Sequence, residues 1–195
     1  MPKALTRYGI PAMLALGAFF VLFALFSASR QPSQPSGLDR FAKGDLANLE
    51  FTAGRAIPAG RFENDRGDMI SLADLGAKPI VLNLWFEACP PCEEEMPSLA
   101  NLQSAVAPDG VLVVAVALDR EYNREANRKA LSDWSGGALR FYFDKSFGLA
   151  YEAGARGMPT TILYDRHGEE VARFSGAADW GGENAVALVR AIAER

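Results

Sequence analysis

The longest apolar run of the chain lies at its start, where the twenty residues from Gly9 to Ala28 carry no charge. A helix rises about 1.5 Å per residue, so this run matches the roughly 30 Å core of a bilayer. The run predicts an uncleaved membrane anchor, because it is long for a signal peptide. A cleavable signal peptide is the alternative, with a small-residue site at Ser27–Ser29. Lys3 and Arg7 predict a cytoplasmic N-terminus and a large C-terminal part on the other side.

The pattern after the run divides the rest of the chain. A polar, proline-rich spacer, Gln-Pro-Ser-Gln-Pro-Ser, follows at 31–36 and is typical of a linker. No strong periodicity is present up to about Ala59, and we allow a short helix around Leu38–Ala47. We therefore expect four parts: a cytoplasmic N-terminus at 1–8, the anchor at 9–28, a linker at 29–57 and a folded domain at 58–195.

Within 58–195 the apolar positions predict alternating strands and helices. Continuous or alternating apolar residues predict strands at Gly60–Asn64, Asp68–Ser71, Pro79–Phe86, Gly110–Leu118, Leu139–Phe143, Thr160–Tyr164 and Glu169–Phe174. Helical spacing predicts helices at Pro90–Ser104, Glu121–Trp134, Phe147–Ala153 and Glu183–Glu194. Turn residues at 65–67 and 165–168 predict two hairpins. This order indicates an α/β domain with a central mixed sheet and helices on both faces.

Charge and composition exclude several kinds of function. Residues 31–195 hold 17 basic and 24 acidic side chains, which disfavours nucleic acid or an anionic membrane surface as the main partner. The chain has two cysteines and one histidine, His167, too few for a structural zinc site with four Cys or His ligands. We expect no metal and no cofactor.

The two cysteines, Cys89 and Cys92, form a CPPC motif between a buried strand and a helix. A CxxC pair alone is also compatible with a metal site, but its position favours redox chemistry. At a helix N-terminus, Cys89 meets unpaired N–H groups and the positive end of the helix dipole, which favour its thiolate. Pro90 and Pro91 cost the helix little, because N–H groups of the first turn have no partner within the helix.

The chain resembles the TlpA/ResA-like branch of the thioredoxin superfamily over about residues 58–195. The resemblance rests on landmarks in a fixed order: Asn83-Leu84-Trp85 before the CPPC motif, Glu95, Pro97, Gly157-Met158-Pro159-Thr160-Thr161 and the turn at 165–168. It implies a thioredoxin-like fold with a cis peptide bond before Pro159. It also implies a membrane-anchored thiol–disulfide oxidoreductase whose domain lies outside the cytoplasmic membrane.

The resemblance assigns a role to each site residue. Cys89 attacks a partner's disulfide and Cys92 resolves the mixed disulfide, with no cofactor besides the Cys89–Cys92 couple. Glu95 would take the proton of Cys92, and Met158 with Pro159 would bind the substrate peptide. We expect Trp85 in the core beside the site, and we also count it among the residues that contact the substrate.

The expected partners are an exported client protein with a disulfide and a membrane thiol donor of the CcdA or DsbD kind. Glutamates around the motif, Glu87, Glu93 and Glu94, oppose a stable thiolate and favour a reductase over a DsbA-like oxidase. Clients in cytochrome c maturation or copper-site assembly fit the resemblance. Thr160 stands where CcmG/DsbE-type proteins often carry Glu, which favours a general TlpA-like reductase.

Ala88, Glu93 and Glu94 depart from the family pattern, and two other functions compete. Ala88 stands where tryptophan is common, which removes an aromatic wall beside the nucleophile. A copper metallochaperone of the Sco type would need CxxxC and a nearby histidine, whereas the one histidine here lies in a distant turn. A peroxiredoxin-like peroxidase would need Thr or Ser a few residues before its cysteine, and residues 85–88 contain neither.

Overall fold

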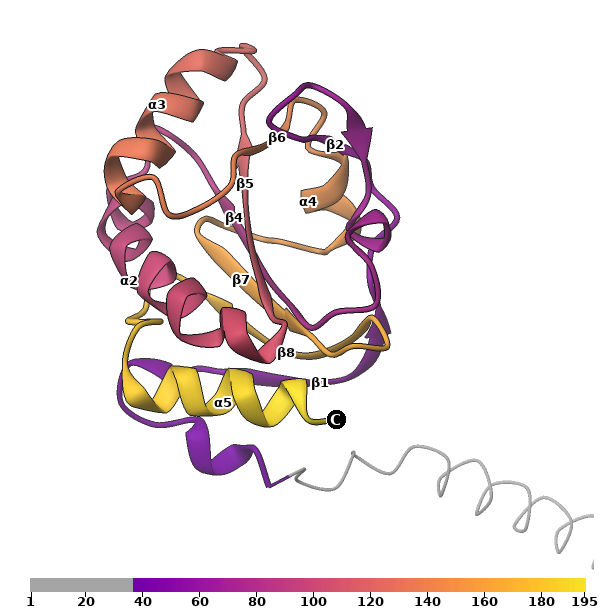
Figure 1. Cartoon of the computed structure of the whole chain (residues 1–195), viewed down its shortest axis with the longest axis vertical. Coiled ribbons are helices and arrows are strands. Elements are labelled where there is room, and N and C mark those ends of the chain that lie inside the picture. Colours follow the sequence, from indigo (N-terminus) through magenta and orange to yellow (C-terminus); the bar gives the residue numbers. More distant parts are fainter. Residues whose placement is uncertain (1–36) are drawn as a thin grey trace, which may run out of the picture. The chain divides into compact units, whose positions relative to one another are not determined.

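The computed structural model describes residues 37–195, which form one compact unit from Gly37 to Arg195 (Figure 1). The anchor predicted at 9–28 lies outside the described residues. Among the helices of 37–195, none combines the length and apolar character that crossing a bilayer requires. The strands are β1 Glu50–Ala56, β2 Phe62–Glu63, β3 Met69–Ile70, β4 Ile80–Trp85, β5 Leu112–Leu118, β6 Tyr142–Asp144, β7 Thr160–Tyr164 and β8 Glu169–Ser175. The α-helices are α2 Pro90–Val106, α3 Arg124–Ser135, α4 Gly148–Glu152 and α5 Glu183–Ala193.

All eight strands join one mixed sheet in the order β1-β8-β7-β4-β5-β6-β2-β3. The central strand β4 pairs in parallel with β5 and antiparallel with β7. Leu84 near the end of β4 is opposite Thr160 at the start of β7. This register places the segment before Thr160 next to the loop that leaves β4.

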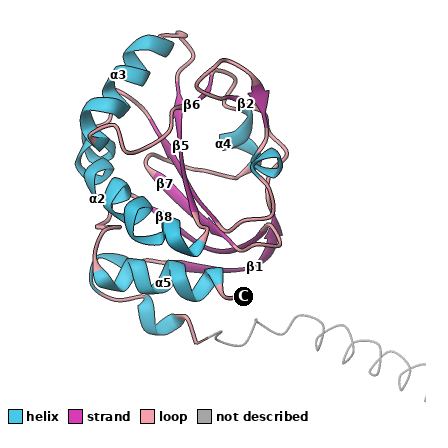
Figure 2. Cartoon of the chain, viewed as in Figure 1, coloured by secondary structure: helices cyan, strands magenta, loops and turns pink. Residues whose placement is uncertain are grey.

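Helices cover both faces of the sheet, with α2, α3 and α5 on one side and α4 on the other (Figures 1 and 2). Alternate residues of β4 point to opposite faces. Val81 and Trp85 join the core under α2 and α5, whereas Leu82 and Leu84 join the core under α4. Asn83 therefore lies on the α2 side, in the middle of a fully buried strand.

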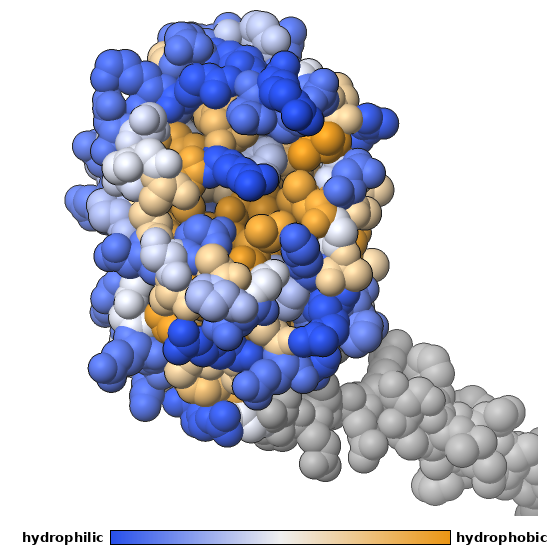
Figure 3. Space-filling view, in the orientation of Figure 1, coloured by the Kyte–Doolittle hydropathy of each residue, from blue (hydrophilic) through white to orange (hydrophobic). Residues whose placement is uncertain are grey.

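The predicted α/β class and thioredoxin-like arrangement are confirmed. The strands and helices predicted between 60 and 194 are present, with ends that differ by a few residues. Hydrophilic residues dominate the face shown in Figure 3, and an apolar area lies near its centre.

The start of the folded domain was predicted wrongly. Residues 37–57, expected to belong to a linker, contribute the edge strand β1, which pairs with β8, and two short 3-10 turns. The turns replace the single helix allowed around Leu38–Ala47, because Gly44, the first residue of the second turn, has a positive φ of 59°. The strand lacked a clear pattern because Gly54, also at positive φ, interrupts its pairing with a register shift. Leu38, Leu46 and Leu49 are buried in the core.

Candidate active site

The cysteine pair lies at the junction of β4 and α2. Cys89 is the N-cap residue of α2, and a disulfide joins its Sγ to the Sγ of Cys92. The Cys89 carbonyl accepts hydrogen bonds from the backbone N–H groups of Cys92 (2.9 Å) and Glu93 (3.1 Å). The side chain of Cys89 is the outer one, since Cys89 is 8% exposed and Cys92 is 0% exposed.

The helix start favours a negative charge on the sulfur of Cys89. The backbone N–H of Cys92 points at that sulfur, 3.3 Å away. Pro90 occupies the first helical position, and the helix then runs for 17 residues through Pro97 to Val106. Free N–H groups and the dipole of such a helix lower the pKa of a thiol at its N-terminus. This position is the one expected of the attacking cysteine in such a pair.

Glu95 is buried one helical turn after Cys92, on the same side of α2. It is 2% exposed. Burial raises the pKa of Glu95 from its ordinary value of 4.5 to about 7, and hydrogen bonds from Asn83, Ala178 and Trp180 partly oppose that rise. A carboxyl group with this pKa can accept a proton at neutral pH and release it again.

Three segments hold the carboxylate of Glu95. From β4, Asn83 Nδ2 donates to Oε1 at 2.7 Å. From the segment between β8 and α5, the Ala178 N–H and Trp180 Nε1 donate to Oε2 at 3.3 and 3.2 Å. Asn83 Nδ2 also donates to Thr161 Oγ1 at 3.0 Å, which ties the group to β7.

These partners of Glu95 were not predicted from the sequence. Asn83 offered one signal, because an amide in the middle of a buried apolar strand requires a buried partner. Trp180 offered none, since it is 85 residues from Glu95 along the chain.

A surface hollow of about 410 Å³ connects Glu95 with solvent. Glu95 and Ser98 line it from α2, and Ala178 and Asp179 line it from the segment after β8. The hollow gives water access to a carboxylate that is otherwise enclosed. A proton taken up by Glu95 can leave by this route.

The peptide bond between Met158 and Pro159 is cis, as the resemblance implies. Pro159 is buried and Met158 is half-buried. The Pro159 carbonyl accepts a hydrogen bond from the Gly176 N–H at 2.9 Å. Because Thr160 is opposite Leu84, this segment lies at the end of β4 from which the cysteine loop leaves.

Trp85 does not face the substrate. It is 0% exposed, and its ring packs edge-on against Trp134 with the centroids 5.4 Å apart. The last residue of β4 points into the core under α2 and α3, which confirms the expected core position beside the site, whereas the expected substrate contact finds no exposed surface on Trp85. Its Nε1 has no hydrogen-bond partner in the described part of the chain. Trp85 belongs to the same buried cluster as Cys89 and Cys92.

Within 37–195, no three His, Cys, Asp or Glu side chains are placed to share a metal ion. His167 lies in the turn between β7 and β8, at the end of β7 remote from the cysteines.

Comparison with known proteins agrees with this geometry. The Redoxin family model matches residues 52–189. Thiol-disulfide oxidoreductase ResA of Halalkalibacterium halodurans is 34% identical over 58% of this chain, and the match spans 63% of that protein, a little under two thirds. ResA of Bacillus thuringiensis is 31% identical over 69% of this chain and 76% of its own length.

Among solved structures, a DsbF homologue from Corynebacterium diphtheriae is 26% identical and superposes with a TM-score of 0.62. The superposition covers 85% of this chain and 98% of that one. The resemblance inferred from the CPPC motif and its neighbours is confirmed. The chain belongs to the Redoxin family and, within it, is similar to the thiol–disulfide oxidoreductases named ResA.

Proposed function

We propose that this chain is a thiol–disulfide oxidoreductase that reduces the disulfides of client proteins. The observation that carries the proposal is the pairing of two unequal cysteines with one buried acid. Cys89 caps a helix at the surface, Cys92 is enclosed, and Glu95 follows one turn later with a pKa of about 7. Each feature serves a different step of one exchange reaction.

In the first step, the Cys89 thiolate attacks one sulfur of the client disulfide. A bond forms between Cys89 and that sulfur, and the client's other sulfur leaves as a thiolate. The hydrogen bond from the Cys92 N–H and the helix dipole stabilise the attacking thiolate. Met158 and Pro159 border the cysteines on the β7 side and would hold the client's backbone.

In the second step, Cys92 gives its proton to the Glu95 carboxylate and attacks the sulfur of Cys89. The mixed disulfide breaks, and the client's remaining sulfur leaves as a thiolate that is then protonated. The client has gained two electrons, and Cys89 and Cys92 end in the disulfide seen in the structure. Glu95 can pass its proton to water in the hollow that it lines.

The direction of electron flow follows from charge. A strongly oxidising couple results when the thiolate form is stabilised. Here Glu87, Glu93 and Glu94 are exposed beside the cysteines, and Glu95 is enclosed next to them. Their negative charge opposes the thiolate, which supports a reductant.

We further propose that a membrane thiol donor of the CcdA or DsbD kind restores the dithiol. With residues 9–28 as an anchor, the domain would lie outside the cytoplasmic membrane, where cytochrome c maturation and copper-site assembly supply disulfide clients. The resemblance to ResA supports this setting. Membranes washed with carbonate should retain the full-length chain, and recovery of a freely soluble form starting near Gln31 would refute the anchor.

A redox titration tests the function itself. The Cys89–Cys92 couple should equilibrate with glutathione or dithiothreitol at a potential nearer the roughly −270 mV of thioredoxin than the roughly −120 mV of DsbA. The reduced chain should also reduce a peptide disulfide. A potential above about −170 mV would identify an oxidase instead, since it lies closer to the DsbA value.

A further inference from the structure

A second hollow, of about 420 Å³, opens beside the cysteine loop, and Glu95 is not among the residues that line it. Glu87 and Ala88 line it from the residues just before Cys89, and Asp119 lines it from the loop after β5. Ala88 is exposed, and its methyl group leaves this space open where a larger side chain would occupy it. A client held at Cys89 therefore meets the hollow immediately beside its attacked sulfur.

The loop that forms one wall is held by its own hydrogen bonds. Asp119 Oδ1 accepts from the Glu121 N–H at 2.8 Å, and Oδ2 accepts from the Asn123 N–H at 3.0 Å. Asp119 Oδ2 also accepts from Asn127 Nδ2 at 2.9 Å. All three bonds close within the loop and the first turn of α3, so this wall is preformed.

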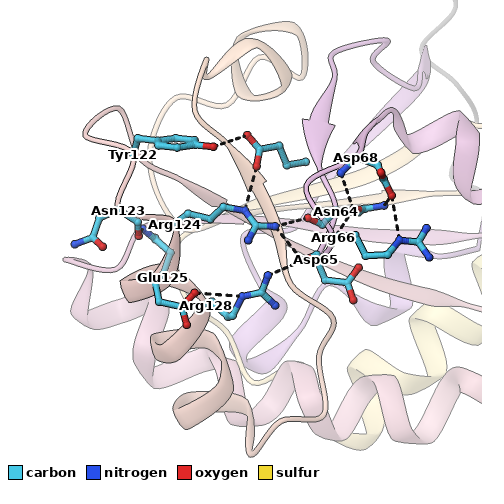
Figure 4. A network of polar contacts seen from close by, with 11 residues as sticks. Asn64, Asp65, Arg66, Asp68, Tyr122, Asn123, Arg124, Glu125 and Arg128 are labelled. Atoms are coloured by element: carbon cyan, nitrogen blue, oxygen red, sulfur yellow. Dashed lines mark hydrogen bonds and ion pairs between the residues drawn. The ribbon is translucent and has the colours of Figure 1, made fainter.

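A polar network fastens the same loop to the β2–β3 hairpin (Figure 4). The Tyr122 hydroxyl donates to Glu63 Oε1 at 3.4 Å, and Arg124 Nε donates to Glu63 Oε2 at 3.0 Å. Arg124 and Arg128 both donate to the Asp65 carbonyl, at 3.0 and 2.6 Å. A loop fixed from two sides can offer a binding surface without first being ordered, which lowers the cost of binding.

The walls of the hollow combine an apolar surface with negative charge. The rings of Phe86 and Phe147 lie 5.8 Å apart and can cover an aliphatic stem. Glu87, Asp119 and Glu121 contribute three carboxylates against one cation, Arg120, whose guanidinium lies over the Phe147 ring at 4.8 Å. Lysine and arginine side chains bury their stems on apolar surface and keep the charge near acids.

A buried, uncharged acceptor without a donor accompanies these carboxylates. Asn127 lines the hollow and is 0% exposed, yet its Oδ1 has no hydrogen-bond partner in the described part of the chain. Exchanging the positions of the amide oxygen and nitrogen would lose two hydrogen bonds, because Nδ2 already donates to Asp119 Oδ2 and to the Asn123 carbonyl, each at 2.9 Å. A donor that enters the hollow would meet this unpaired acceptor and the carboxylates together.

We propose that this hollow is a specificity site for a lysine or arginine side chain that flanks the attacked cysteine of the client. The proposal rests on the reductase function above and names a feature of its substrates. Clients with a cation next to the disulfide should be reduced faster than clients without one.

The test uses two peptides that share one disulfide and differ in a single flanking residue, arginine or norleucine. The full-length reduced chain should reduce the arginine peptide at least about tenfold faster in kcat/KM, as expected for a hydrogen bond to a charged group. Glu121→Gln and Ala88→Trp should bring that ratio toward one, by removing a carboxylate and by filling the hollow. Raising the salt concentration should also lower the ratio.

Glu93→Gln is the matched control, because Glu93 is exposed next to Cys92 but is not among the residues that line the hollow. It should leave the ratio unchanged. An equal loss of the ratio in Glu93→Gln and Glu121→Gln would show general electrostatics and overturn the site. Equal rates for both peptides with the unmodified chain would overturn it while leaving the reductase function intact. If neither peptide were reduced, the proposed function itself would fail, and this inference with it.

Discussion

The side-chain amide of Asn83 donates a 2.7 Å hydrogen bond to the carboxylate of Glu95, from the middle of β4 to the second turn of α2. Both side chains are buried, at 0% and 2% exposure. This bond favours the charged form of Glu95 and limits how far burial raises the pKa of its carboxyl group. The amide thus sets the proton affinity of the proposed base.

Replacement of Asn83 by leucine should raise the pKa of Glu95 above its value of about 7. A hydrogen bond to a charged group is worth about 1.5 kcal/mol, which corresponds to roughly one pH unit. Infrared or carbon NMR titration of the Glu95 carboxyl in the oxidised protein would measure the shift. Asn101→Leu, on the same helix as Glu95, is a control that should leave the pKa of Glu95 unchanged. If the pKa of Glu95 stayed at about 7 in Asn83→Leu, the amide of Asn83 would not set the proton affinity of Glu95.

Glu95→Gln should slow the resolving step, because the amide cannot take the proton of Cys92. Losses of general-base catalysis are typically about 10²–10⁴-fold, and water in the adjoining hollow would reduce the loss. Single-turnover reduction of a peptide disulfide between pH 6 and 9 would measure it, with accumulated mixed disulfide as the expected sign. An unchanged rate across that range would show that Glu95 has no part in proton transfer.

The raised pKa of Glu95 also predicts a pH dependence of stability. Between 4.5, its ordinary value, and about 7, the folded protein binds a proton at this site that the unfolded chain has released. The contribution of Glu95 to the free energy of unfolding is therefore fullest below pH 4.5 and falls by up to roughly 3 kcal/mol as pH rises through 7. Denaturant unfolding of the oxidised protein at several pH values should show this fall.

Denaturant unfolding of Glu95→Gln at the same pH values shows how much of the fall is due to the carboxyl group of Glu95. Glutamine does not titrate, so the decline between pH 4.5 and 7 should be smaller in the variant. Parallel curves for the two proteins would contradict the assignment of the buried acid.

A chain that begins at residue 58 should be far less stable than one that begins at residue 37. The shorter chain lacks β1 and the buried side chains of Leu38, Leu46 and Leu49. Loss of a buried leucine side chain costs about 2–5 kcal/mol, and total stabilities are about 5–15 kcal/mol. Urea unfolding of the two chains compares their stabilities directly. Equal urea midpoints for the two chains would show that residues 37–57 add no stability and act as a linker.

Sequence reasoning succeeded where the signal was local. The strand β4, the helix α2 and the position of Cys89 at the junction follow from an apolar run, a helical period and a motif of four residues. The edge strand β1 was missed because Gly54 and a register shift interrupt its pattern. An edge strand with one neighbour needs no continuous apolar run.

The rest of the site depends on packing between distant segments. Glu95 could be named from the resemblance, but its contacts with Asn83 and Trp180 arise from the way α2 crosses β4 and the segment after β8. Trp85 was expected both in the core and in contact with the substrate, and the folded chain shows the core position alone. The hollow beside Ala88 joins residues from 86 to 147 and likewise exists only in the folded chain.

The unequal roles of Cys89 and Cys92 are the central claim, and trapping of mixed disulfides tests it most directly. Cys92→Ser should accumulate disulfide-linked adducts on a non-reducing gel of cells that express it, because Cys89 attacks and nothing resolves the product. Cys89→Ser should trap little, since the remaining sulfur at position 92 is 0% exposed. Serine is close in size to cysteine, so both variants should fold. Adducts that accumulate on Cys89→Ser and not on Cys92→Ser would reverse the assigned roles and contradict the account.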